Sequence, residues 1–212
     1  MASSMIHIAV ANEINKTLKR DSKSILIGSI APDIAKQVGM EKKQSHFQDT
    51  NDSLPKLDLF LSKYKDNLND DFVLGYYIHL YTDYLWFKYF EPDFYKNGVI
   101  YKLDGSIENI PDEKKRDFFY NDYTNLNIKL IDEYNLELSI FYEETPKFNN
   151  IIKEIPMDKI NVIIDQAGII IENSKENKSY IFDMKIVNKF INTSVEFILS
   201  NLKDIGVIKK LG

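Results

Sequence analysis

The chain has 212 residues, of which 44% are hydrophobic and 28% are charged, and its formal net charge is −5. This composition excludes a disordered or fibrous protein, and the length allows one domain with a sizeable core. The negative charge argues against a broad nucleic-acid interface, because phosphate backbones are bound by basic faces. The chain has no cysteine, which excludes disulfide bonds and thiolate metal ligands.

The N-terminal residues contain no basic leader followed by a long apolar core, so we expect no signal peptide. No uncharged apolar run reaches the length of a bilayer span, so we also expect no transmembrane segment. We therefore expect a cytoplasmic protein that forms a single helical domain over residues 1–212. Met5 is interpreted as the natural start, with residues 1–4 an addition ahead of it.

The first half of the chain predicts helices separated by short polar segments. Apolar residues recur every four positions from Ile6 to Leu18, which predicts an amphipathic helix. The apolar run 25–30 fits either a strand or a buried helix, and Gly28 within it permits close backbone approach. Residues 41–55 are predicted to form a polar loop, and residues 57–64 return to helical spacing. The long run 72–90 is predicted to be the central helix, with Asp70 or Asp71 as its N-cap.

The second half is predicted to be mostly helical too. An Asp-Gly pair between β-branched residues in 99–110 predicts a small hairpin. Helical spacing follows in 113–134, 157–172 and 184–202, and Thr145-Pro146 is interpreted as the start of another short helix. The predicted fold class is all-α, a single-domain multi-helix bundle with at most one small β-hairpin.

The central run carries two ionisable residues in an apolar and aromatic setting. His79 and Asp83 are four residues apart, so both project from one face of a helix. Burying such a pair is costly unless something compensates for it, and a metal ion is one such compensation. A core histidine bonded to a carboxylate is the alternative interpretation.

The other candidate ligands also lie in the first half of the chain. The only other histidines are His7 and His46, and Asp33 follows a proline at a bend after the apolar run 25–30. Imidazole and carboxylate together suit zinc, and also manganese or iron(II). We therefore expect a metal site in residues 5–90, built from His7, Asp33, His46, His79 and Asp83.

These residues lie in motifs whose order resembles that of the zinc-dependent phospholipase C family, which is related to zinc-dependent single-strand nucleases. The motifs are His7, GSIAPD at 28–33, SHF at 45–47 and LGYYIHLYTD at 74–83. The resemblance implies a helical fold and the hydrolysis of a phosphodiester or phosphomonoester by a metal-activated water. It also implies that Asp33, His46, His79 and Asp83 hold one metal, that His7 and Asp83 contribute to a neighbouring one, and that Asp33 is a metal bridge and catalytic base.

The chain departs from the family pattern downstream of the central run. Family members with three zinc ions use further histidines there, and this chain has none after His79. Asp122, among aromatic residues on a predicted helix, is the best candidate for a replacement ligand, although a helical aspartate is usually solvated. We therefore expect one or two zinc ions, with manganese or iron as substitutes, rather than three.

Two other functions are compatible with the same residues. An HD-type helical phosphohydrolase also uses histidine and aspartate on helices, but this chain lacks the adjacent His-Asp dipeptide. A non-catalytic helical domain with a structural or degenerate metal site would account for the missing downstream histidines. For an enzyme, the expected partner is a phosphoester small molecule or a phospholipid headgroup.

Overall fold

The computed structural model describes residues 2–51, 53–176 and 178–208, and it is mostly helical with one small antiparallel sheet. The α-helices in chain order are α1 (Ser4–Leu18), α2 (Ser22–Gly28), α3 (Ile34–Gln37), α4 (Lys42–Ser45), α5 (Leu57–Tyr64), α6 (Asp71–Leu85), α7 (Asp112–Tyr134), α8 (Ile160–Glu172) and α9 (Met184–Asp204). The predicted all-α class with a minor β element is confirmed.

The central helix α6 is buried around most of its circumference, as expected for a helix with few polar residues. Asp70 is its N-cap, as the sequence predicts, and accepts hydrogen bonds from the backbone N–H groups of Phe72 and Val73. At its C-terminal end the backbone widens into one π-helical turn, Trp86–Phe90, so the predicted single helix 72–90 is two segments.

A close crossing of α2 and α6 fixes the centre of the fold. A Cβ atom at Gly75 would lie 2.2 Å from the carbonyl oxygen of Ile25, and one at Gly28 would lie 2.3 Å from the carbonyl oxygen of Phe72. Only glycine lets the two backbones approach this closely. The predicted role of Gly28 is confirmed, and the ambiguous apolar run 25–30 belongs to helix α2 and the turn after it.

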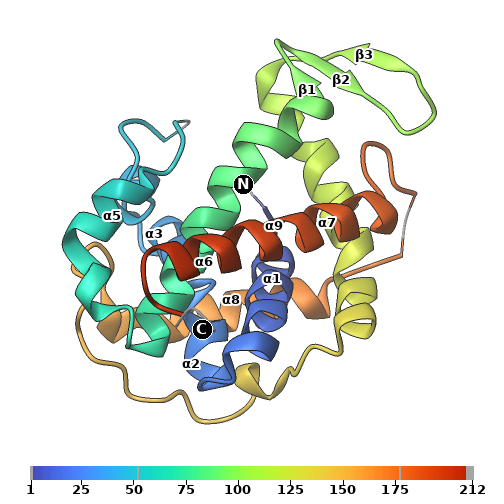
Figure 1. Cartoon of the computed structure of the whole chain (residues 1–212). Helices are drawn as coiled ribbons and strands as arrows, with labels where there is room; N and C mark the ends of the chain where they lie inside the picture. Colours follow the sequence, from blue (N-terminus) through green and yellow to red (C-terminus); the bar gives the residue numbers. More distant parts are fainter. Residues whose placement is uncertain (1, 52, 177, 209–212) are drawn as a thin grey trace.

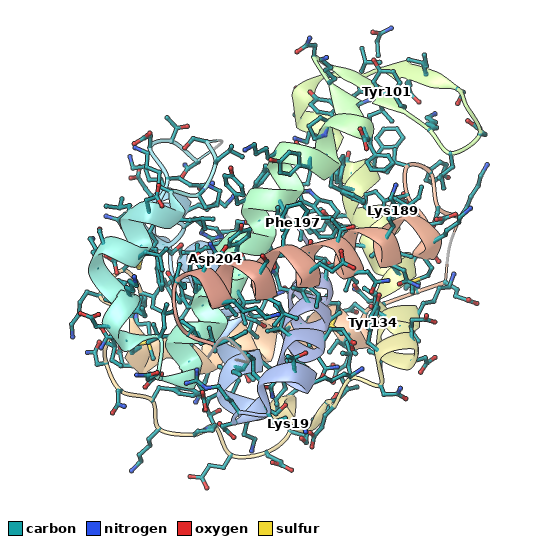
Figure 2. All side chains as sticks on the ribbon, in the orientation of Figure 1. Lys19, Tyr101, Tyr134, Lys189, Phe197 and Asp204 are labelled. Atoms are coloured by element: carbon teal, nitrogen blue, oxygen red, sulfur yellow. The ribbon has the colours of Figure 1, made fainter. Side chains whose placement is uncertain are left out.

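Helices from both ends of the chain complete the core. Figure 1 shows α9, in red, crossing the front of the molecule next to α1, with α7 at one side and α5 at the other. Asp183 caps α9 through the N–H of Ile186, as the sequence predicts. The outer face of α9 stays exposed, and Figure 2 labels Lys189, Phe197 and Asp204 along it.

The β element is larger than the predicted hairpin. Strands β2 (Val99–Tyr101) and β3 (Ile107–Asn109) pair on either side of the Asp-Gly turn, and β1 (Tyr95–Lys96) adds a third strand on the other side of β2. The sheet projects from one end of the helical body (Figure 1), and Tyr101, labelled on it in Figure 2, is exposed.

Two predictions about local structure are wrong. The segment 145–155 contains no helix among its residues, all of which the structure describes, and instead runs as an irregular connection. Its buried anchors are Ile152 and Ile155, which are too few for a helical apolar face. The predicted loop 41–55 contains the short helix α4, which ends directly before His46. Among the parts of the chain that are described, no helix is both long and apolar enough to span a membrane.

Candidate metal centre

The structure brings together five of the six candidate ligands, which come from separate segments of the chain. His7 lies on α1, Asp33 ends the 3₁₀ turn Ala31–Asp33 after α2, and His46 follows α4. His79 and Asp83 lie one turn apart on α6. Two groups whose ligand atoms lie within 4.8 Å of one another are present among the described residues, and both include His79: one adds His7 and Asp83, and the other adds Asp33 and His46.

Hydrogen bonds on the outer side of two imidazoles define their tautomers. The Nδ1 atom of His79 lies 2.7 Å from the carbonyl oxygen of Ser29, so it must carry the hydrogen and donate it. The Nδ1 atom of His46 lies 3.2 Å from the carbonyl oxygen of Lys42 and 2.9 Å from Oγ of Ser45, whose hydroxyl itself donates to that carbonyl. The Nε2 atom of His79 is therefore a bare acceptor, and that of His46 is one too when its ring hydrogen lies on Nδ1.

These two nitrogens face each other. The Nε2 atoms of His46 and His79 are 3.2 Å apart, and both side chains are fully buried. With the ring hydrogens of both histidines on Nδ1, two lone pairs meet at this distance and repel. Two imidazoles on one tetrahedral zinc would place their nitrogens about 3.4 Å apart, given Zn–N bonds of about 2.05 Å. The observed separation therefore matches a pair of nitrogens that share a cation.

Two carboxylates complete the environment of this nitrogen pair. Asp33 Oδ1 lies 3.6 Å from His46 Nε2, and Asp83 Oδ2 lies 3.8 Å from His46 Nε2 and 3.9 Å from His79 Nε2. Both oxygens are buried and have no hydrogen-bond partner within the described part of the chain. The two nitrogens and the Asp33 oxygen lie within 4.8 Å of one another, and Asp83 forms the other such group with His7 and His79. The five residues therefore line two adjoining positions, and imidazole nitrogen with carboxylate oxygen is a donor set that zinc accepts.

His7 lies beside this space rather than around it. Its ring stacks on the ring of His79, with centroids 3.8 Å apart and planes 12° from parallel. The lone pair of an imidazole nitrogen lies in the ring plane, so a single ion cannot lie in both planes. His7 Nε2 is instead 3.3 Å from Asp83 Oδ1, which also accepts a hydrogen bond from the backbone N–H of Ala2 at 3.0 Å. His7 and Asp83 thus form a second, less complete position next to the first.

The electrostatics of the cluster favour neutral imidazoles and ionised carboxylates. Burial lowers the pKa of His46 and, together with the nearby His7, lowers that of His79 well below its usual range. Burial alone would raise the pKa of Asp33, but His46 and the positive charge of Lys36 outweigh it and lower the pKa. Burial likewise opposes ionisation of Asp83, and the adjacent His7 overcomes it, so that pKa is also lowered well below its usual range. These are the protonation states that metal ligation requires.

Asp122 is the sixth candidate, and it lies in neither of the two groups found in the described chain. Its carboxylate accepts hydrogen bonds from the backbone N–H groups of Tyr180, Ile181 and Phe182, at 2.8–3.1 Å. It therefore ties the segment before α9 to α7. The three backbone N–H groups compensate for the burial of the Asp122 carboxylate. The expectation that Asp122 replaces a missing histidine did not consider such groups.

A cavity of about 260 Å³ opens next to the cluster, and we call it the proximal cavity. Its walls come from the start of α1, from Asp33 and Lys36, and from α7 and α8, including Tyr120, Tyr123 and Gln166. Asp33 is 8% exposed, whereas the other four candidate ligands are fully buried, so it is the ligand that borders the cavity.

Several residues around the cluster could not be recognised from the sequence. The Lys36 amino group lies 3.9 Å from Asp33 Oδ1, and the i,i+3 spacing of these residues is the only sequence signal. Burial raises the pKa of Tyr123, which lines the cavity, so its phenol stays neutral and can donate a hydrogen bond. The carbonyl of Ser29 and the backbone N–H of Ala2 leave no trace in the sequence, because any residue offers these groups.

Comparison of the chain with protein-family models, with curated proteins and with solved structures finds no match. The cluster is therefore the feature from which a function can be inferred.

Proposed function

We propose that this protein is a metal-dependent hydrolase of phosphoric esters, similar to phospholipase C, with zinc as its metal. His46, His79, Asp33 and Asp83 would hold the main ion, and His7 with Asp83 would hold a second one more weakly. Manganese or iron(II) could occupy the same donors.

The observation that carries this proposal is the facing pair of imidazole nitrogens, 3.2 Å apart, beside two buried carboxylate oxygens that have no hydrogen bond among the described residues. A purely structural histidine would be expected to pair its lone pair with a donor, because leaving a buried polar atom unsatisfied costs about 1–3 kcal/mol. The ligand atoms of Asp33, His46 and His79 lie within 4.8 Å of one another, and Asp83 Oδ2 lies 3.8–3.9 Å from the two nitrogens, so a cation is the simplest compensation.

A zinc ion bound there would polarise a phosphoryl oxygen and lower the pKa of a water molecule towards neutrality. The residues of the chain would do the rest. Asp33, at the border of the proximal cavity, would accept the proton of the attacking water as catalytic base. The water oxygen would form a bond to phosphorus, the ester P–O bond would break, and the leaving oxygen would take up the proton that Asp33 had accepted. Lys36 and the neutral phenol of Tyr123 would orient the phosphoryl oxygens.

A phosphoester small molecule or a phospholipid headgroup is the proposed substrate, because the proximal cavity is too small for a folded polymer. Its volume of about 260 Å³ is close to the lower limit for small-molecule sites. The chain's net negative charge gives a nucleic acid no broad basic face.

Metal binding is the first test. The purified protein is stripped with EDTA, reloaded, and assayed for zinc, manganese and iron by elemental analysis and by competition with a chromophoric chelator. We expect about one tightly bound zinc per chain, and at least tenfold weaker binding in Asp33→Asn. Asp122→Asn is the matched control, because it removes the same charge at another buried aspartate outside both groups. Failure of the wild-type protein to bind any of the three metals would end the proposal.

Activity is the second test, with p-nitrophenyl phosphate and bis(p-nitrophenyl) phosphate as substrates. Zinc-dependent release of p-nitrophenol that is lost in Asp33→Asn and retained in Asp122→Asn supports a hydrolase. A screen of nucleotides against phospholipid headgroup esters separates a phospholipase C-like enzyme from an HD-type phosphohydrolase.

A non-catalytic protein with a structural metal is the second candidate. The full burial of His7, His46, His79 and Asp83 favours it, since a sealed ion holds segments together without meeting a substrate. Tight zinc binding without hydrolysis of any ester would decide for this candidate.

A further inference from the structure

The side chain of Asn127 on α7 carries an unused hydrogen-bond acceptor in the wall of the proximal cavity. This cavity is lined by one face of the helix, on which lie Tyr120, Tyr123, Thr124 and Asn127. Asn127 is 2% exposed, and its Oδ1 atom is buried without a hydrogen-bond partner among the described residues. The proposed hydrolysis gives this residue no role.

The orientation of the Asn127 amide follows from the hydrogen bonds of a neighbouring serine. Nδ2 of Asn127 lies 3.0 Å from Oγ of Ser174, and that hydroxyl donates its only hydrogen to the carbonyl oxygen of Ile170, at 2.9 Å. Ser174 can therefore only accept from Asn127, which fixes the NH₂ group on this side of the amide and the carbonyl oxygen on the other. Because Ser174 is not among the residues that line the cavity, Oδ1 is the amide atom that remains for a ligand.

The cavity wall away from the metal cluster is uncharged. Asp33 and Lys36 are the only charged side chains among the described residues that line the cavity, and they lie 3.9 Å apart. The rest of the wall combines three isoleucine side chains of α8 with amide and hydroxyl groups, among them those of Gln166 and Thr124. A second charge on a ligand would lose its hydration here without gaining a counter-ion, and this is unfavourable. The group beyond the phosphate is therefore expected to be neutral.

We propose that the substrate is a phosphoester whose organic group is uncharged and carries a hydroxyl, and that Asn127 Oδ1 accepts the hydrogen bond of that hydroxyl. The phosphate would lie beside Asp33 and Lys36, and the hydroxylated group would lie along the cavity face of α7. A ligand without a donor leaves the buried acceptor unsatisfied, and sites of this kind discriminate strongly against such ligands. This inference rests on the proposed hydrolase function and names its substrate class.

Binding of phosphonates tests the hydroxyl preference without turnover. Isothermal titration compares 2,3-dihydroxypropylphosphonate with propylphosphonate and with 2-aminoethylphosphonate, on the zinc-loaded protein and in EDTA. We expect the dihydroxy ligand to bind about tenfold more tightly than propylphosphonate, which corresponds to about 1.4 kcal/mol, and the ammonium ligand to gain nothing. The ratio should also hold in EDTA, because Asn127 belongs to neither group of candidate metal ligands. Equal affinities for the dihydroxy and propyl ligands, tightest binding of the ammonium ligand, or no binding of any of the three would each overturn the inference.

Two variants assign the preference to the Asn127 amide. Asn127→Leu removes the acceptor and should abolish the tenfold ratio, while propylphosphonate binds as before. Ser174→Ala leaves the cavity wall intact but lets the amide rotate, so the ratio should fall about threefold. An unchanged ratio in Asn127→Leu, or in Ser174→Ala where Asn127→Leu fails to fold, contradicts the proposed contact.

Asn125→Leu is the matched control, because Asn125 is a buried asparagine on the same helix that does not line the cavity. Its amide also donates to a serine hydroxyl, that of Ser179, at 2.6 Å. This variant should keep the tenfold ratio. An equal loss in Asn125→Leu would show a general effect of removing a buried amide and would overturn the inference. Circular dichroism and thermal unfolding establish that each variant is folded before affinities are compared.

Hydrolysis separates the fate of this inference from that of the proposed function. The zinc-loaded protein should cleave p-nitrophenyl 2,3-dihydroxypropyl phosphate with a kcat/KM about tenfold higher than that for p-nitrophenyl propyl phosphate, mainly through a lower KM. If neither diester is cleaved but the phosphonate ratio holds and is lost in Asn127→Leu, the hydroxyl site stands and only the hydrolase proposal fails. If both diesters are cleaved with the same kcat/KM, the hydrolase proposal stands and the substrate class inferred here is wrong.

Discussion

The substitution Gly75→Ala tests the crossing on which the candidate metal centre is built. The new Cβ would lie 2.2 Å from the carbonyl oxygen of Ile25 and 3.0 Å from the Cα of Gly28, and both are backbone atoms that no rotamer change can move. Helices α2 and α6 would have to separate by roughly 1 Å to restore an ordinary contact.

The expected cost follows from two opposing effects. Overpacking of a well-packed interface costs about 1–3 kcal/mol, occasionally more, and the separated helices also lose dispersion contacts along the crossing. Alanine is favoured over glycine within a helix by about 1 kcal/mol, which offsets part of this. We expect a net loss of about 1–2 kcal/mol in the free energy of unfolding, or a Tm lower by about 2–8 °C for a chain of this size.

The assay is thermal and urea unfolding followed by far-UV circular dichroism, with Gly168→Ala as the control. A Cβ at Gly168, within α8, would have no atom within 4 Å among those considered, so that variant should gain about 0.5–1 kcal/mol from helix propensity alone. Gly75→Ala should also weaken zinc binding, because the carbonyl of Ser29 that orients His79 follows α2 directly. Equal or higher stability of Gly75→Ala would refute the close crossing.

Three further predictions concern the cluster and its surroundings. Zinc at a hundredfold excess over its Kd should stabilise the protein by about 2.7 kcal/mol, and differential scanning calorimetry with and without EDTA measures this; an unchanged Tm would contradict it. In the metal-free protein the lowered pKa values keep His46 and His79 neutral while the unfolded chain binds protons, so stability should fall as the pH drops below about 6.5, by up to about 2.7 kcal/mol per pH unit. Asp33 and Asp83 also have lowered pKa values, so their contribution to the free energy of unfolding is complete above about pH 4 and is lost below it. Urea midpoints that stay constant between pH 3.5 and 8 in EDTA would argue against both pH effects. Asp122→Ala removes the acceptor of three backbone N–H groups and should lower the free energy of unfolding by about 3–5 kcal/mol. The affinity of the folded variant for zinc, measured by chelator competition, should not change.

The residues of the cluster could be named from the sequence because their setting is chemically unusual. His79 and Asp83 stand out in an apolar run, and the four-residue spacing places them on one face of α6. The scarcity of histidine then restricts any imidazole site to His7, His46 and His79. Most helices were also predictable, since α1, α5, α7, α8 and α9 each carry a local apolar periodicity, and capping residues such as Asp70 and Asp183 act within one turn.

Other features depend on contacts between segments that are far apart in the chain. Asp122 and Asp83 are both aspartates in aromatic surroundings, yet one meets three backbone N–H groups and the other meets imidazoles. The helix expected after Thr145 does not form, because its apolar residues find separate places in the core instead of a common face.

Local sequence thus determined which side chains are available and which helices carry them, because helix spacing and capping act over a few residues. Only the tertiary structure decided that the Nε2 atoms of His46 and His79 face each other, that the carbonyl of Ser29 sets the tautomer of His79, and that a cavity opens beside Asp33. The physical reason is that these arrangements depend on how closely α2 and α6 can approach at Gly28 and Gly75, and that approach is a property of two surfaces in contact.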